Sequence, residues 1–238
     1  MGYVEGFVTP VPVRNRDAYV HHAERAVPFI AAGGMTRFVE AWGEDLPEGK
    51  VTDFRRAVLA EPDEAVLFSW FEYPDRAVRD RANARMASDP AAEAMMEGMP
   101  FDAGRMIWSG FEVVSEVGTA GPIGHIDGML APAPADGRAR FAALGARVGA
   151  ALVAAGASRV VDCWGDDLLQ GVRTDYPRAV AMAPGETVVW SWIEWPSAAA
   201  REAGWAQVMA AGVMPPPDEM PFCPRRMIHG GFRPILQV

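Results

Sequence analysis

Two histidines and two carboxylates form the strongest chemical pattern in the sequence. His125 and Asp127 begin one predicted strand, Glu194 ends another, and His229 lies on the last predicted strand of the chain. Side chains two residues apart on a strand share a face. If the start of the first strand meets the ends of the third and fourth at one sheet edge, the four side chains lie together. They are therefore the candidate catalytic residues.

These residue types fit three roles. Two imidazoles and a carboxylate can hold a divalent metal ion. Without a metal, a histidine that titrates near neutral pH and is oriented by a carboxylate can act as an acid or a base. The histidines can also simply fill space at the sheet edge while hydrogen-bonded to Asp127 and Glu194. The sequence does not decide between acid–base chemistry and simple packing for these residues. A metal site is the least expected role, so no metal is expected.

A second set of acidic and aromatic side chains is expected to face the space between two sheets. Small residues such as Val4, Gly6 and Val8 are then expected to face the helices. The set forms an acidic, aromatic pocket, which favours cationic ligands. Alternatively, the carboxylates accept hydrogen bonds from arginines such as Arg37 and Arg159, and the tryptophans are core residues. The candidate ligand-binding residues are Glu5, Glu40, Trp42, Trp70, Glu72, Trp108, Asp162, Trp164, Trp190 and Trp192.

An internal duplication places these residues in two similar copies. With an offset of 122, the motif WGEDL at 42–46 aligns with WGDDL at 164–168, and SWFE at 69–72 aligns with SWIE at 191–194. Self-similarity at a fixed period indicates a repeated structural unit. The expected division is a first repeat at 1–116, a linker at 117–123 and a second repeat at 124–238.

Each repeat has the pattern of a βαββαβ unit. This order predicts an α+β fold in which a ferredoxin-like antiparallel sheet carries two helices on one face. Two such sheets can bury their bare faces together, so the chain is expected to form an intrachain α/β barrel with a pseudo-two-fold axis. Asp75 and Ser197 are expected N-caps of the second helices, and Asp136 is the expected N-cap of the helix that ends near Gly156. In the first repeat the predicted strands are 3–9, 36–42, 65–72 and 105–113, with a helix at 16–32.

Composition narrows the classes of function. The net charge of −9 and the scattered arginines argue against a nucleic-acid partner. We see no apolar run of about 18 residues and no signal peptide, so a cytoplasmic protein without a membrane span is expected. The two cysteines, Cys163 and Cys223, have no metal-type spacing. Glycine-rich phosphate loops and nucleophile elbows are absent as well, and no cofactor is expected.

Four segments carry a resemblance to a known family. They are YVEGFVTPVP at 3–12, FVEAWGEDLPEGKVTDFRRAV at 38–58, FSWFEYP at 68–74 and MPFDAGRMI at 99–107. Together they resemble the YbaA-like bacterial domain family of unknown function. The second repeat departs from the pattern, because Val172 and Cys223 replace Lys50 and Asp102. The family is similar to the dimeric α/β-barrel superfamily, which includes cofactor-independent monooxygenases, lactone isomerases, polyketide cyclases and haem enzymes. This resemblance implies the fold but no particular chemistry.

Two functional hypotheses follow. The first is an enzyme without an organic cofactor, of the monooxygenase, isomerase or cyclase type, that acts on a small molecule in the inter-sheet pocket. The second is a non-catalytic ligand-binding, sensor or structural protein of the same fold. Duplication also allows one pocket to diverge while the other is kept. Whether the fused chain dimerises further is left open.

Overall fold

Eight antiparallel strands close into one barrel in the computed structural model, which describes residues 2–90, 92 and 98–238. The strand order around the barrel is β1-β3-β2-β8-β5-β7-β6-β4. The first repeat contains β1 (Tyr3–Pro12), η1 (Val13–Asn15), α1 (Arg16–Ala31), β2 (Arg37–Asp45), α2 (Phe54–Ala57), β3 (Glu64–Tyr73), α3 (Arg76–Ser88) and β4 (Ile107–Gly118). The second contains β5 (His125–Pro134), α5 (Arg138–Ala154), β6 (Arg159–Asp167), α6 (Tyr176–Ala179), β7 (Glu186–Trp195), α7 (Ala198–Ala210), η2 (Pro217–Glu219), η3 (Pro224–Arg226) and β8 (Ile228–Gln237).

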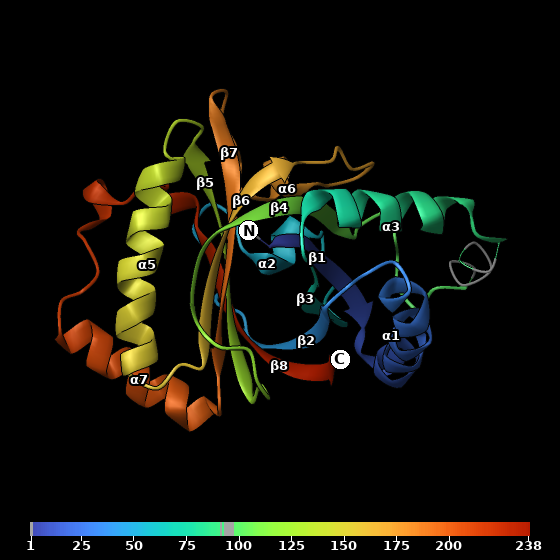
Figure 1. Cartoon of the computed structure of the whole chain (residues 1–238), viewed down its shortest axis with the longest axis horizontal. Coiled ribbons are helices and arrows are strands. Elements are labelled where there is room, and N and C mark those ends of the chain that lie inside the picture. The colour runs from blue at the N-terminus through green and yellow to red at the C-terminus, as the bar shows by residue number, and fades with distance from the viewer. Residues whose placement is uncertain (1, 91, 93–97) are drawn as a thin grey trace.

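The two repeats form the two halves of the barrel wall. Within each repeat the strand order is the ferredoxin-like one, β4-β1-β3-β2 and β8-β5-β7-β6. The repeats join at two seams, where β2 pairs with β8 and β4 pairs with β6. Helices α1 and α3 cover one side of the barrel, and α5 and α7 cover the other (Figure 1). The predicted duplication and the intrachain α/β barrel are therefore confirmed.

The ends of the helices and strands show which of the predicted caps and boundaries are correct. Asp75 and Ser197 cap α3 and α7, because their side chains accept hydrogen bonds from the backbone N–H groups of Val78 and Ala200. The predicted cap at Asp136 is wrong, since α5 has Gly137 at its N-cap without a side-chain hydrogen bond. Strand β4 continues to Gly118, two residues into the expected linker, because it pairs with β6 along the seam.

Large aromatic rings fill the interior of the barrel. Phe68 stacks on Trp190 with ring centroids 4.3 Å apart, and Trp70 lies 4.7 Å from Trp192. These four side chains and Phe232 are at most 1% exposed. The inter-sheet space that was expected to be a ligand pocket is thus packed with rings, so that part of the prediction is wrong.

Small residues on neighbouring strands make room for these rings. A Cβ on Gly6 would stand 2.9 Å from Cε2 of Trp190, and a Cβ on Gly128 would stand 3.0 Å from Cε2 of Phe232. Val4 and Val8 pack in the same core. The inner face of β1 therefore carries the small residues, opposite to the prediction.

The same correction applies to most of the other strands. Strands β3 and β7 point inward as predicted, with Phe68, Trp70, Glu72, Trp190, Trp192 and Glu194 on the inner side. The candidate pocket residues of the remaining strands instead face outward, towards the helices. They are Glu5, Glu40, Trp42, Trp108, Asp162 and Trp164.

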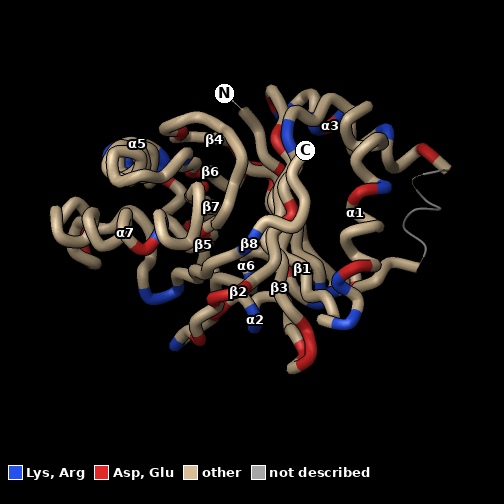
Figure 2. The backbone as a smooth tube through the Cα atoms, turned by 90° about the horizontal axis from the view of Figure 1, so that it is seen from below, with Lys and Arg blue, Asp and Glu red and all other residues tan. Residues whose placement is uncertain are grey.

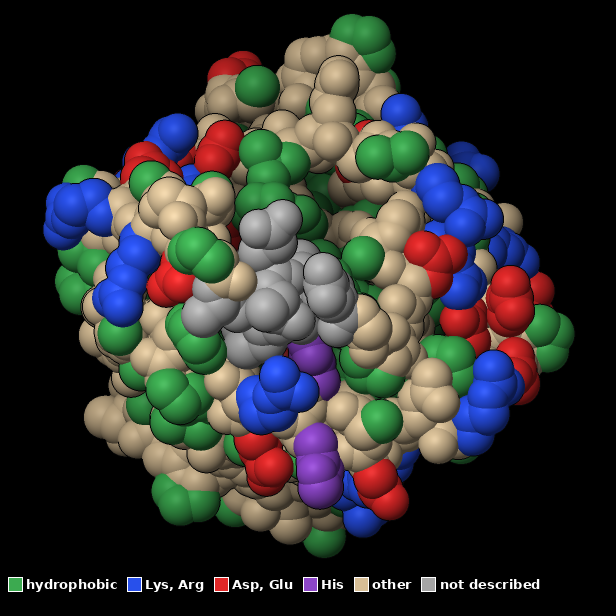
Figure 3. All heavy atoms as spheres, turned by 90° about the vertical axis from the view of Figure 1, so that its right-hand side faces the viewer, with side chains coloured by type: hydrophobic (Ala, Val, Ile, Leu, Met, Phe, Trp, Pro, Cys, Tyr) green, Lys and Arg blue, Asp and Glu red, His purple; other side chains and the backbone are tan. Residues whose placement is uncertain are grey.

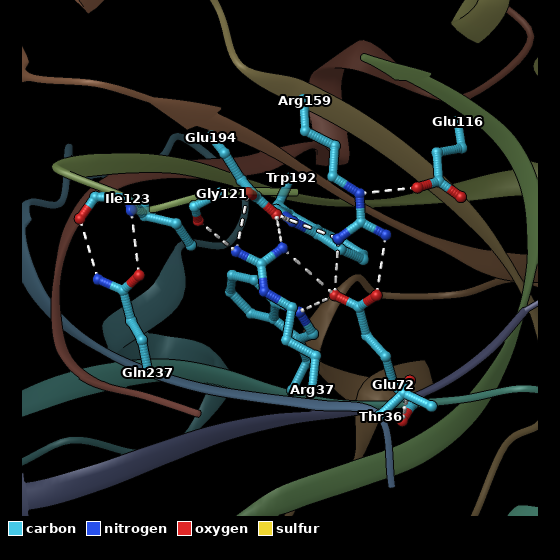
Figure 4. Close-up of polar contacts among 11 residues, drawn as sticks. Thr36, Arg37, Glu72, Glu116, Gly121, Ile123, Arg159, Trp192, Glu194 and Gln237 are labelled. Atoms are coloured by element: carbon cyan, nitrogen blue, oxygen red, sulfur yellow. Dashed lines mark hydrogen bonds and ion pairs between the residues drawn. The ribbon is translucent and has the colours of Figure 1, made fainter. Parts of the chain in front are cut away.

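Four charged side chains link the two repeats at one end of the barrel. Arg37 donates to both carboxylate oxygens of Glu194, at 2.7 and 3.0 Å, and Arg159 donates to both of Glu72, at 2.7 and 2.8 Å (Figure 4). Arg37 and Arg159 are equivalent in the two repeats, as are Glu72 and Glu194, so the network follows the pseudo-two-fold axis. The alternative interpretation of Glu72 and Glu194 as acceptors for arginines between the halves is confirmed.

The arginines of this network keep Glu72 ionised in spite of the low exposure of the network. The side chains of Arg159 and Glu194 are 5% and 0% exposed. Burial raises the pKa of Glu72, but the hydrogen bonds and the charge of Arg159 outweigh it and hold the pKa below its usual value. Trp70 and Trp192 each donate a further Nε1–H bond of 2.9 Å, to Glu72 and Glu194 respectively.

Charged residues are mixed elsewhere on the molecule. Acidic and basic positions alternate along the backbone tube rather than separating onto two sides (Figure 2). In the part of the chain that the structure describes, no helix has both the length and the apolar composition needed to cross a membrane.

Removal of one cation from the network is expected to be costly. Arg159→Met leaves Glu72 and Glu194 buried with only Arg37, so we expect the free energy of unfolding to fall by about 3–5 kcal/mol. Arg37→Met is expected to cost a similar amount because of the pseudo-symmetry. Urea unfolding measures the change. The control is Arg14→Met, which removes a 2.7 Å pair with Asp63 whose side chains are 72% and 59% exposed, and which should cost about 1 kcal/mol or less. Equal losses for Arg159→Met and the control would contradict the role given to burial.

Candidate functional site

Two equivalent pockets lie outside the barrel, one in each repeat, between the sheet and its helices. The first-repeat pocket, between the sheet and helices α1 and α3, has a volume of about 690 Å³. The second-repeat pocket, beneath α5 and α7, has a volume of about 310 Å³. Figure 3 shows the α1–α3 side, where hydrophobic side chains surround a hollow in the surface.

The first-repeat pocket is largely aromatic. Its described wall includes Phe7, Phe38, Phe71, Phe101 and Trp108. Phe71 lies between the rings of Phe7 and Phe38, at centroid distances of 4.8 and 4.7 Å. Helices α1 and α3 add polar side chains such as Tyr19, His22 and Asn83, and the acidic side chains Glu5 and Glu40 come from the sheet. Such a pocket, mostly apolar with a few convergent polar groups, is typical of a small-molecule site.

Glu40 is a buried carboxyl group on this wall, and none of the described residues forms an ion pair with it. It extends from β2, is 6% exposed, and accepts a 2.8 Å hydrogen bond from the hydroxyl of Tyr19 on α1. Ser69 on β3 also donates to it, and both donors use Oε2, so that neither bond occupies Oε1. Burial raises the pKa of Glu40 to about 7, although the bonds from Ser69 and Tyr19 act in the opposite direction. Near neutral pH this group therefore exists in both protonation states.

Glu5 is a second buried carboxyl group on the same face of the sheet. Its Oε1 accepts a 2.7 Å bond from Nδ2 of Asn83, with Nη1 of Arg79 at 3.5 Å. Burial raises its pKa, and the bond from Asn83 and the charge of Arg79 only partly offset this. The strand register places Glu5 opposite Phe71 and Glu40 opposite Ser69. The two carboxyl groups thus lie at diagonal corners of one patch of the pocket floor.

The second-repeat pocket keeps the equivalent carboxyl groups in different surroundings. Asp162 replaces Glu40, is 8% exposed, and accepts a 2.8 Å bond from Ser191. Phe141 stands where the first repeat has Tyr19, so the tyrosine hydroxyl is missing. Burial raises the pKa of Asp162 to about 6.

Asp127, the equivalent of Glu5, is fully engaged by donors. It accepts bonds from Nε1 of Trp195 at 2.8 Å, from Nε1 of Trp205 at 2.8 Å and from Nε of Arg201 at 2.5 Å. A carboxylate held by three donors, one of them a cation, is a structural acceptor rather than a base.

The predicted cluster of two histidines and two carboxylates is only partly present in the structure. Asp127 and exposed His229 both line the second-repeat pocket. Glu194 lies on the other face of the sheet, bound to Arg37 and Arg159, so the prediction that it joins them is wrong. His125 is buried beside Gly231, and burial lowers its pKa. Among the described residues, no group of three or more His, Cys, Asp or Glu side chains is arranged to hold a metal ion.

The predicted tryptophans occupy different environments. Trp108 lines the first-repeat pocket. Trp192 packs against Trp70 in the barrel core and also borders the second-repeat pocket. Trp70 and Trp190 belong to the barrel core. The guanidinium carbon of Arg16 lies 5.7 Å from the ring centroid of Trp42. The ring centroids of Trp164 and Phe141 are 6.0 Å apart.

Sequence reasoning missed Tyr19, Ser69 and Asn83, the hydrogen-bond partners of the two carboxyl groups in the first-repeat pocket. A signal for Tyr19 was present: Tyr19, Ala23 and Ile30 are the buried residues of α1 and share one face at helical spacing. A tyrosine on a face that packs on a sheet needs a partner for its hydroxyl group. Asn83 lies on α3 and is recognisable only once the helix is placed over β1.

Comparison with known proteins identifies relatives of each repeat. A family model described as "Protein of unknown function (DUF1428)" matches residues 2–103 and 124–224. The uncharacterized protein YbaA of Escherichia coli strain K12 is 53% identical over 114 residues, which are 48% of this chain and 97% of that protein. The protein of the same name in Shigella flexneri gives the same values.

Solved structures share the whole two-repeat fold at low sequence identity. Two are described as a "putative monooxygenase". The one from Fusobacterium nucleatum has a TM-score of 0.62 at 9% identity and covers 99% of this chain and 93% of its own. The one from Lactobacillus acidophilus has a TM-score of 0.60 at 10% identity, with coverage of 100% and 95%. An anthrone oxidase-like protein has a TM-score of 0.55 at 11% identity, with coverage of 100% and 92%. At these identities the likeness extends to the fold alone.

The raised pKa of Glu40 makes a prediction that requires no ligand. Because the folded pKa of about 7 lies above the ordinary value of 4.5, the folded state binds this proton more tightly. The contribution of Glu40 to the free energy of unfolding is therefore lost as the pH rises from 4.5 to about 7. Relative to the wild type, Glu40→Gln should gain about 2–3 kcal/mol in unfolding free energy between pH 5 and pH 8. Urea unfolding at several pH values measures the difference. Glu48→Gln, at a side chain that is 84% exposed, is the flat control, and a pH-independent difference for Glu40→Gln would show that its pKa is ordinary.

Proposed function

The chain belongs to the family of proteins of unknown function named DUF1428, and we propose that its first repeat is an enzyme that removes a proton from a small aromatic molecule. The observation that carries the proposal is the position of Glu40, a carboxyl group with no cationic partner on the wall of an aromatic pocket. A general base works best when its pKa is near the working pH, and burial gives Glu40 a pKa of about 7.

Glu5 completes an acid–base pair across the pocket floor. Burial raises its pKa, and in its protonated form the carboxyl group can donate a hydrogen bond to a ligand oxygen. A flat ligand lying on Phe71 would then have Glu40 on one side and Glu5 on the other. Glu40 accepts the proton while Glu5 stabilises the negative charge that develops on the ligand oxygen. Tyr19 and Ser69 hold the base in place through its Oε2.

This step is common to the three reaction types of the enzyme hypothesis, which are oxygenation, isomerisation and cyclisation. Isomerisation and cyclisation start from a carbanion or an enolate, and oxygenation without a cofactor starts from an electron-rich anion that reacts with O₂. The neighbours described as monooxygenases and as anthrone oxidase-like make oxygenation the first reaction to examine. For anthrone the balanced reaction is anthrone plus O₂ giving anthraquinone plus water, in which the ring methylene is oxidised and O₂ is reduced.

The second repeat lacks parts of this arrangement. Phe141 replaces Tyr19, and the acid equivalent to Glu5 is held by three donors. We therefore assign proton abstraction to the first-repeat pocket alone.

Anthrone provides a direct probe of the proposed step. Under nitrogen in D₂O the protein should speed exchange of the methylene protons, followed by NMR, and in air it should speed O₂ uptake. Glu40→Gln should lower both rates by about 10²–10⁴-fold, and the wild-type rate should rise with pH through about 7 as Glu40 ionises.

Two controls separate the base from general damage. Asp17→Asn, at a side chain of α1 that is 94% exposed, should leave both rates unchanged. Tyr19→Phe should alter the pH profile, because it removes a donor that lowers the pKa of Glu40. Proton exchange without O₂ uptake would assign isomerase-type chemistry. Binding of anthrone with no rate that depends on Glu40 would instead indicate a binding protein.

A further inference from the structure

The second-repeat pocket has lost polar side chains that its first-repeat equivalent carries. The replaced pairs are Thr9 and Ala131, Tyr19 and Phe141, His22 and Leu144, and Asn83 and Trp205. The polar atom that these replacements add, Nε1 of Trp205, is bound to Asp127. A change in the opposite direction puts His229 in place of Trp108, but the His229 side chain is exposed. The interior of the second pocket is therefore more apolar than that of the first.

The carboxyl group of Asp162 is closed off from the pocket although its residue borders the wall. Oδ1 accepts a 2.8 Å bond from Ser191. Oδ2 is buried, and the hydroxyl group of Ser115 is the second hydrogen-bond partner of the carboxyl group. Gly145 brings the backbone of α5 over this oxygen, since a Cβ at this position would collide with Oδ2. A ligand in the pocket therefore cannot use Asp162.

Among the described residues, Asp127 and Arg201 are the other charged groups of the wall. They bind each other at 2.5 Å, and Asp127 also accepts the bonds from Trp195 and Trp205. A charged ligand would lose its hydration in this pocket without meeting an available opposite charge, which costs free energy. The same holds for a hydroxyl group that finds no partner. The surroundings fit a ligand that has neither.

Methionines and aromatic rings form much of the wall. The described residues include Met129, Met220, Met227, Phe141, Leu144 and Phe222. Methionine adapts its shape to its neighbours, and its sulfur makes favourable contacts with aromatic rings. The pocket has a volume of about 310 Å³. An apolar cavity of about 150 Å³ holds benzene, so this pocket has room for two fused rings.

We propose that the second-repeat pocket is a binding site for an uncharged aromatic hydrocarbon of two rings. The rings pack among Met129, Met227, Phe141 and Phe222, and burial of their apolar surface supplies the affinity. This site is independent of the activity proposed for the first repeat, because it uses none of the residues around Glu40.

Naphthalene is the probe for this site, and methionine methyl groups are the reporters. Met129, Met214, Met220 and Met227 border the second-repeat pocket, and Met86, Met99 and Met106 border the first. NMR spectra of the full chain, labelled with ¹³C at the methionine methyl groups, therefore report binding at each pocket separately. Single methionine-to-leucine variants assign the signals. We expect naphthalene to shift the second-pocket signals along one saturable curve, which gives the Kd.

A polar analogue tests the chemical class of the ligand. In 1,5-dihydroxynaphthalene the two hydroxyl groups lie on opposite sides of the same rings, so at least one of them must enter the pocket. Because no partner awaits it there, we expect this compound to bind at the second pocket about tenfold or more weakly than naphthalene.

The duplication supplies matched variants. Met227→Trp fills the second pocket, and Met106→Trp makes the equivalent change in the first. The shift of Met129 should disappear in Met227→Trp and persist in Met106→Trp. Leu144→His restores the residue of the first repeat at a half-buried position of α5, and it should weaken naphthalene binding by about tenfold. It serves as the second variant if Met227→Trp does not fold.

Three results would overturn this site: no shift of the second-pocket signals in saturated naphthalene, an unchanged Kd in the folded variants of the second pocket, or equal affinity for naphthalene and 1,5-dihydroxynaphthalene. The anthrone rates report on Glu40 and are measured separately. Either of the two sites can therefore fail its test while the other passes.

Discussion

Ring packing inside the barrel determines where chemistry can occur in this protein. Phe68 lies against Trp190 and Trp70 against Trp192, and these rings occupy the space between the two halves of the wall. The neighbouring strands must present small residues to them, which is why Gly6 and Gly128 face inward. Alternation along a strand then sends the acidic side chains of the same strands to the outside, beneath the helices. Both pockets are a consequence of that constraint.

The hydrogen-bond partners separate the acids of the seam from the acids of the two pockets. Glu72 and Glu194 each accept hydrogen bonds from an arginine of the opposite repeat and thereby join the halves. Glu40 and Asp162 are met only by neutral hydroxyl groups among their hydrogen-bond donors. A buried acid without a cation is a poor stabiliser, because desolvation opposes its charge. The burial of Glu40 without a cation therefore agrees with the ligand chemistry that we propose for it.

The sequence predicted the fold well because the repeat and the βαββαβ pattern are strong signals. It offered arginine–carboxylate bridges as one of two interpretations of the acidic residues, and the structure has these bridges at Glu72 and Glu194 but not at Glu40 or Asp162. The site was predicted less well. Alternation shows that Glu5 and Phe7 share a face, but not which face it is, and that choice depends on the volume of rings such as Trp190 on the opposite half. Tyr19 was missed because its partner, Glu40, becomes its neighbour only when α1 folds over the sheet.

Residues 119–124 join β4 to β5 in one chain. This short connection removes the dependence of the seams between the repeats on protein concentration. A protein of one repeat, which is the extent of the match to the E. coli relative, would leave β2 and β4 as open edges until a second copy arrived. Its barrel would then depend on protein concentration. In the fused chain the partner strand is always present at a high effective concentration, so dilution cannot separate the halves. In the fused chain a substitution in one half is not repeated in the other half. Every molecule can therefore carry Tyr19 at one pocket and Phe141 at the equivalent position of the other.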